Sequence, residues 1–96
     1  MPRVSNREVQ ESRMRVLVFL GERTRGQKCP VSLSYRVISQ TTGLSRVQVR
    51  SICGYLEQKG LVRRVASFAE DGGQRANCFS ITPRGWKRLR EYEQVV

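Results

Sequence analysis

The sequence predicts an α+β fold in which three helices, a two-stranded β-hairpin and a C-terminal helix form one domain. Apolar residues recur at helical spacing in the first half of the chain, and two segments rich in Val, Phe and Ile flank a glycine turn. The 96 residues, 39% of them apolar, suffice for one modest core. We therefore expect residues 1–6 to form a flexible arm and residues 7–96 to form a single domain.

The first helix is predicted over residues 7–20, where most apolar residues fall on one stripe and Gly21 supplies a stop. Met14 and Val18 lie off this stripe. The helix therefore has a second apolar face, which can pack either in its own domain or against a partner subunit.

The second and third helices are predicted to form a helix-turn-helix unit. Ser34 is a suitable N-cap for a helix over residues 35–41, and Gly43 can end this helix in the left-handed conformation. Ser45 then caps a third helix over residues 46–59. Two helices joined by such a short turn are typical of nucleic-acid-binding domains.

Strand-compatible residues predict a very short strand at residues 31–33 and a hairpin formed by residues 61–68 and 76–82. The hairpin turn is Glu-Asp-Gly-Gly-Gln at residues 70–74, and the last helix is predicted over residues 83–95 after a Thr-Pro pair.

The charge balance predicts a polyanionic partner. The chain has 18 Lys and Arg against 8 Asp and Glu, a formal net charge of +10. Between Arg23 and Ala69 many cations accompany a single acid, Glu57, whereas four of the other acids lie near the ends, at Glu8, Glu11, Glu91 and Glu93. We therefore expect the middle of the chain to face the polyanion.

The third helix is the predicted DNA-reading element, because a helix fits the major groove of a duplex. Helical rotation places Val49, Ile52, Cys53 and Leu56 on its buried side and hydrogen-bonding residues on the other side. Arg pairs with guanine and Gln with adenine, while the hairpin at residues 68–76 can enter the minor groove. The residues expected to contact DNA are Arg36, Ser45, Arg46, Val47, Gln48, Arg50, Ser51, Gly54, Tyr55, Arg63, Arg64 and Arg75.

Gly54 would lie exposed in the middle of this helix, where glycine costs about 0.8–1.0 kcal/mol relative to alanine. Close approach of a phosphate backbone would explain it, and so would packing of a neighbouring element. The sequence does not choose between these two explanations.

Residues 34–91 resemble the winged helix-turn-helix domains of MarR-like and PadR-like transcription regulators. The resemblance lies in Thr42-Gly43-Leu44-Ser45, Val49, Leu56, Lys59-Gly60-Leu61-Val62-Arg63-Arg64 and Phe79-Ser80-Ile81-Thr82-Pro83-Arg84-Gly85. It implies a sequence-specific transcription regulator that reads bases with residues 45–51 and carries Arg75 at the tip of its wing. Full MarR-like proteins are longer and build a ligand pocket for which this chain has little room, so we expect no small-molecule effector.

We further expect a homodimer. It would bind an inverted repeat with its two recognition helices about 34 Å apart. Core packing within one chain is the alternative explanation for the same apolar residues. The residues assigned to the dimer interface are Met14, Val18, Trp86, Leu89, Tyr92 and Val96.

Other classes of function find little support. The chain has no histidine, no paired carboxylates and no phosphate-cradling glycine loop, so we expect no enzyme. Its three cysteines lack metal-ligand spacing, and we expect neither a metal site nor a cofactor. With no signal peptide or membrane-spanning segment in the sequence, we expect a cytoplasmic, DNA-associated protein.

Three questions stay open at this level. The domain could instead be an architectural or plasmid or viral DNA-segregation protein that coats DNA with low sequence specificity. Cys29, in a basic loop, or Cys78, on a strand, could act as a redox switch. The sequence also leaves open whether a regulator of this kind represses or activates.

Overall fold

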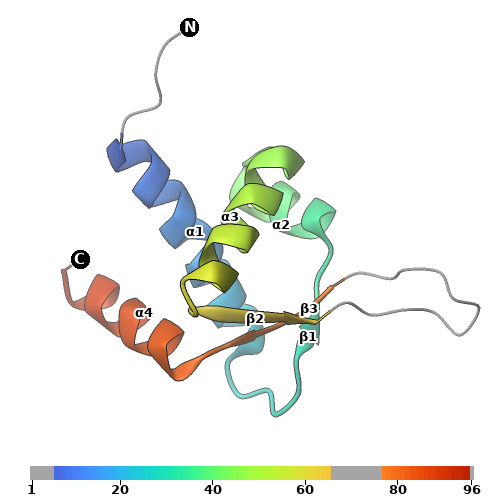
Figure 1. The fold of residues 1–96 in the computed structure, drawn as a ribbon, viewed down its shortest axis with the longest axis vertical. Helices are drawn as coiled ribbons and strands as arrows, with labels where there is room; N and C mark the ends of the chain where they lie inside the picture. The colour runs from blue at the N-terminus through green and yellow to red at the C-terminus, as the bar shows by residue number, and fades with distance from the viewer. Residues whose placement is uncertain (1–5, 66–76, 96) are drawn as a thin grey trace, which may run out of the picture.

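The computed structural model describes residues 6–65 and 77–95 and confirms the predicted α+β class (Figure 1). Residues 1–5 of the expected arm lie outside the described residues. The predicted hairpin tip, including Arg75, also lies outside them. The elements are, in order, α1 (Asn6–Thr24), β1 (Val31–Ser32), α2 (Tyr35–Thr42), α3 (Arg46–Gln58), β2 (Val62–Val65), β3 (Cys78–Ile81) and α4 (Pro83–Val95).

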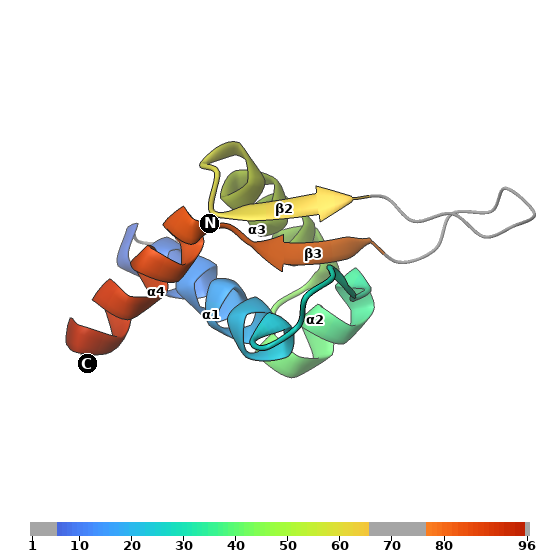
Figure 2. The same cartoon turned by 90° about the horizontal axis from the view of Figure 1, so that it is seen from below.

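The three strands form one antiparallel sheet in the order β1-β3-β2. The central strand is β3. The short strand β1 joins the hairpin strands by pairing with β3, where Val31 lies opposite Phe79. On the other side of β3, Val62 pairs with Ile81 and Val65 pairs with Cys78. Figure 2 shows α4 following the C-terminal end of β3.

The predicted caps of α2 and α3 are confirmed. The backbone N–H of Val37 donates to the Ser34 hydroxyl at 3.1 Å, and Gly43 ends α2 with φ of +77°. Ser45 caps α3, whose first residue is Arg46. These two short-range signals fix where the helix-turn-helix unit begins and turns.

The predicted end of α1 is wrong, because the helix continues past Gly21 to Thr24. Gly21 is buried where α4 packs on α1, and a Cβ atom added there would lie 2.8 Å from Leu89 Cδ1. Close approach of two helices, rather than helix termination, therefore explains this glycine. Gly26, which has φ of +78°, follows the true end of the helix.

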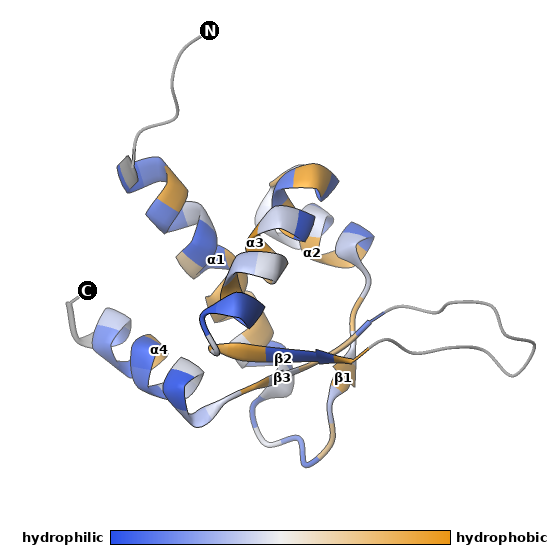
Figure 3. Ribbon diagram, viewed as in Figure 1, coloured by the Kyte–Doolittle hydropathy of each residue, from blue (hydrophilic) through white to orange (hydrophobic). Residues whose placement is uncertain are grey.

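The core forms where α1, α2, α3 and the sheet meet, and Figure 3 shows hydrophobic residues gathered in that region. Its largest fully buried side chains include Phe79, Leu17, Leu20 and Ile38. Burial of each such side chain stabilises the fold by about 1.5–3 kcal/mol.

Two of the residues assigned to a dimer interface belong to this core instead. Met14 and Leu89 are only 7% and 3% exposed within the single chain, because α1 and α4 bury them against their own domain. Val18 and Trp86 are partly buried against the same core, whereas Tyr92 is 38% exposed. Val96 lies outside the described residues. The dimer remains a prediction with a smaller exposed apolar surface than the sequence indicated.

No helix within the described ranges has the length and apolar character needed to span a bilayer. Across the same ranges, no cluster of three or more His, Cys, Asp or Glu side chains is placed to bind a metal ion.

Candidate nucleic-acid interface

The helix α3 presents a polar face to solvent because its opposite face is anchored in the core. Val49 and Cys53 are fully buried, and Ile52 and Leu56 are 8% and 1% exposed, as the periodicity predicted. On the outward face Val47 is 79% exposed. The other exposed residues of this helix and its cap are Ser45, Arg46, Gln48, Arg50, Ser51, Gly54, Glu57 and Gln58.

Ser45 and Gln48 form a capping box at the start of α3. The backbone N–H of Gln48 donates to the Ser45 hydroxyl at 3.1 Å, and the backbone N–H of Ser45 donates to Gln48 Oε1 at 2.9 Å. The N-cap role of Ser45 was predicted, but Gln48 was assigned only to DNA contact, although Ser-x-x-Gln is the signature of a capping box. Arg46, Val47, Gln48 and Arg50 are all exposed, and base reading by them stays a prediction.

Gly54 lies on open surface. A Cβ atom added there would meet no atom within 4 Å among the described residues. Packing of a neighbouring element, one of the two explanations for this glycine, therefore finds no support in the described part of the chain. Approach by an external backbone stays a prediction.

Arg64, which was expected to contact DNA, has hydrogen-bond partners within the domain. Its Nε donates to Glu57 Oε2 at 2.8 Å and its Nη1 donates to the Tyr35 hydroxyl at 2.9 Å. The bond to Glu57 and then the bond to Tyr35 raise the pKa of Arg64 above its ordinary value. Arg64 thereby joins β2 to both α3 and α2. No local sequence pattern reveals this contact, because the partners lie far apart along the chain.

Arg36 and Arg63 are exposed, as a phosphate-contacting role requires. Arg36 lies on the first turn of α2, and Arg63 lies on β2 opposite Ser80. In the sequence, Arg36 precedes α3 and Arg63 follows it.

Tyr55 is half-buried beside a second helix. The Arg13 guanidinium carbon of α1 lies 3.6 Å from the Tyr55 ring centroid, and Lys59 Nζ lies 5.8 Å from it. Such cation–π contacts stabilise the cation over the ring face. Arg13 was not among the predicted site residues, because only the tertiary structure brings α1 next to this flank of α3.

The cysteines differ in accessibility. Cys53 is fully buried, and burial raises the pKa of its thiol from 9.0 to about 11, which keeps it protonated. Cys29 is exposed and Cys78 is partly buried, and both are free thiols. The redox prediction therefore concerns Cys29 and Cys78 alone.

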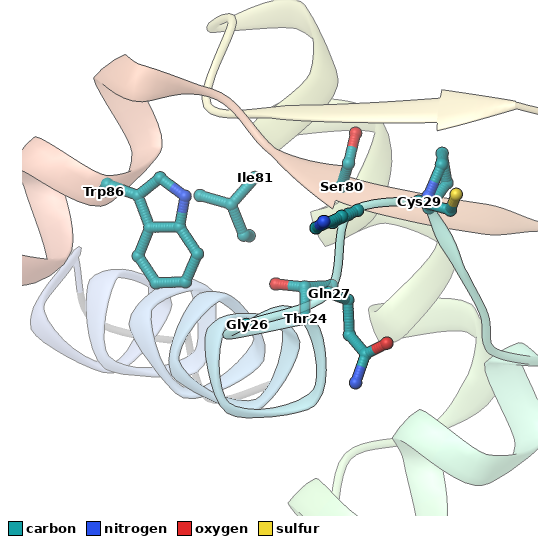
Figure 4. Close-up of a pocket in the computed structure, with 9 residues that line it drawn as sticks. Thr24, Gly26, Gln27, Cys29, Ser80, Ile81 and Trp86 are labelled. Carbon is teal, nitrogen blue, oxygen red and sulfur yellow. The ribbon is translucent and has the colours of Figure 1, made fainter.

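Cys29 borders a hollow of about 400 Å³ between the loop after α1, β3 and α4 (Figure 4). Its sulfur lies at the end of the hollow away from Trp86. The Thr24 hydroxyl in its wall already donates to the Leu20 carbonyl at 2.8 Å. The side chains of Gln27, Lys28 and Ser80 also line this hollow.

No protein-family model matches the chain, and no curated protein sequence matches it. Solved structures do match, and they identify the fold as a MarR-like winged helix-turn-helix. One is a single-residue mutant of S. aureus MepR bound to an oligodeoxyribonucleotide, with a TM-score of 0.68 and 18% identity over 88% of this chain and 55% of that chain.

A second similar structure is the transcriptional regulator PA3341, with a TM-score of 0.62 and 29% identity over 91% of this chain and 57% of that chain. A third is a DNA-binding protein, described as putative, from Ralstonia eutropha, with a TM-score of 0.64 and 21% identity over 85% of this chain and 94% of that chain. The chain thus spans little more than half the length of MepR and PA3341 but nearly all of the Ralstonia protein.

Proposed function

We propose that this chain is a transcription regulator that binds double-stranded DNA in a sequence-specific manner, with α3 in the major groove and the hairpin in the minor groove. One observation carries the proposal: the core holds α3 so that Arg46, Val47 and Arg50 are exposed on a chain of net charge +10. The fold shared with DNA-binding regulators, one of them bound to an oligodeoxyribonucleotide, supports it.

Chemistry assigns a role to each group. The two arginines can donate bidentate hydrogen bonds to guanine, and Val47 can contact a thymine methyl group. The exposed Arg36 and Arg63 would contact backbone phosphates, which position a protein on DNA without reading its sequence. Arg75 would extend this contact into the minor groove. Binding in this way requires no catalytic step.

We further propose that the protein binds an inverted repeat as a homodimer. Two copies related by a twofold axis would present two recognition helices to one duplex. Of the described residues assigned to the interface, Tyr92 is exposed and Val18 and Trp86 are partly buried, so these three remain available to it.

Selection of bound fragments from random duplex DNA, followed by footprinting on the enriched sequence, tests the proposal. A discrete protected site with twofold symmetry is the expected result. Protection that spreads along any duplex would replace the regulator with a DNA-coating protein. Absence of duplex binding at low salt would refute both.

A further inference from the structure

A basic hollow of about 360 Å³ lies between the C-terminal end of α3 and the first turns of α4. Four of its side chains are cations and one is a carboxylate. The polar and aromatic residues that line it are Tyr55, Lys59, Arg84, Lys87, Arg88 and Glu91. None of the four cations was among the residues that the sequence analysis assigned to DNA contact.

Contacts within the domain hold part of this charge in place. Arg84 Nη1 donates to the Lys59 carbonyl at 3.3 Å, which ties the start of α4 to the end of α3. Arg13 and Lys59 both lie near the ring of Tyr55, so a fifth cation adjoins the hollow. The cations therefore converge from three helices on one surface.

The domain neutralises little of this charge. Arg88 Nη1 lies 3.7 Å from Glu91 Oε2, but both side chains are about half exposed and such a pair contributes little in water. Within the described residues, no carboxylate oxygen lies within 4 Å of the ammonium group of Lys59 or Lys87. Clustered like charges repel one another unless an external anion lies among them.

The exposure of the cations favours a polymer over a small ligand. Lys59, Arg84, Lys87 and Arg88 are all exposed, whereas a small-molecule pocket buries most of the surface of its ligand. A phosphodiester backbone that passes over the hollow would meet several cations in succession without being enclosed.

The position of the hollow relative to α3 indicates that this phosphodiester backbone belongs to the duplex that α3 would bind. In Figure 1, β2 runs from the C-terminal end of α3 toward one side of the molecule, and α4 extends toward the opposite side. A duplex that lies across α3 and reaches the hairpin would continue past α3 toward the hollow.

We propose that the basic hollow binds backbone phosphates of the same duplex, on the side of the α3 contact that faces away from the hairpin. The assignment rests on the proposed function and adds a second phosphate-contacting surface to it. Phosphate contacts there would position α3 from the side that the hairpin does not reach.

The test compares a double variant at the hollow with a variant elsewhere on α4. Lys87→Gln, combined with Lys59→Gln, removes two cations of the hollow, whereas Arg90→Gln removes an exposed cation that lines a different surface beside Trp86 and Glu93. All three side chains are exposed, and unchanged thermal unfolding midpoints would show that the variants remain folded.

The measurement is duplex affinity as a function of salt concentration, on the sequence obtained by selection. Neutralising two phosphate contacts should flatten the slope of log K against log salt by about two counterions for each bound subunit of the double variant. Arg90→Gln should leave this slope unchanged. Trimming the duplex on the side away from the hairpin should abolish the difference between the wild type and the double variant.

Equal salt slopes for the wild type, the double variant and Arg90→Gln would refute phosphate binding by the hollow. The proposed function would stay intact. A double variant that keeps its affinity for one duplex but no longer captures a second, labelled duplex would also overturn the assignment, because the hollow would then bind separate DNA. If the wild type binds no duplex, the proposed function itself fails.

Discussion

The glycine in the middle of α3 provides a sharp test, because one methyl group should have opposite effects on folding and on binding. In Gly54→Ala the added Cβ meets no described atom within 4 Å, so it introduces no clash within the described domain. Alanine is more favourable than glycine in an exposed helix interior by about 0.8–1.0 kcal/mol. The variant should therefore be more stable than the wild type by about 1 kcal/mol.

For a domain of this size, about 1 kcal/mol corresponds to a rise of about 4–8 °C in the thermal midpoint, measured by circular dichroism. The matched control is Gly21→Ala, in which the same methyl group would lie 2.8 Å from Leu89 Cδ1 at the buried contact between α1 and α4. Its midpoint should lie below that of Gly54→Ala, because overpacking of a core costs about 1–3 kcal/mol and offsets the same gain in helix propensity.

Duplex titration on the same sample supplies the second half of the test. If a phosphate backbone approaches Gly54, the methyl group of Gly54→Ala should weaken binding several-fold despite the higher stability. A variant that is stabilised and binds as well as the wild type would refute backbone approach as the reason for this glycine. A variant that is destabilised would refute the conclusion that the position faces open space.

Three further outcomes are expected. Arg50→Ala should weaken binding and blur preference at one base position, by about 1–3 kcal/mol of discrimination, and an equal loss on random duplexes would contradict base reading. Arg64→Ala should lower the free energy of unfolding by about 1 kcal/mol, because the bonds to Glu57 and Tyr35 are lost, and should change the salt slope of binding by less than one counterion. A flattened slope at unchanged stability would restore Arg64 to the phosphate contacts. Because the pKa of Cys53 is raised from 9.0 to about 11 in the folded state, its contribution to stability is full below pH 9.0 and is lost as the pH rises toward about 11. Denaturant titrations of wild type and Cys53→Ala across that range measure it, and parallel curves would contradict the shift.

Local chemistry was sufficient for the order and most boundaries of the elements. Ser34, Gly43 and Ser45 act through hydrogen bonds and backbone conformation within a few residues, so their effects can be predicted from the sequence. The buried seam of α3 was predictable for the same reason, since helical periodicity alone decides which side chains share a face. The net charge and the exposed arginines of α3 likewise followed directly from the residues.

Contacts between distant segments had to come from the tertiary structure. The sequence indicated that Gly21 ends a helix, yet packing of Leu89 against it explains the glycine, and α1 runs on to Thr24. Arg64 and Tyr55 were both expected to face DNA. That expectation stays a prediction, but the fold also gives Arg64 the partners Glu57 and Tyr35 and places Arg13 over the Tyr55 ring. The physical reason is the same in each case: a side chain takes the partner that the packing of helices and strands brings within reach, and the sequence does not encode that distance locally.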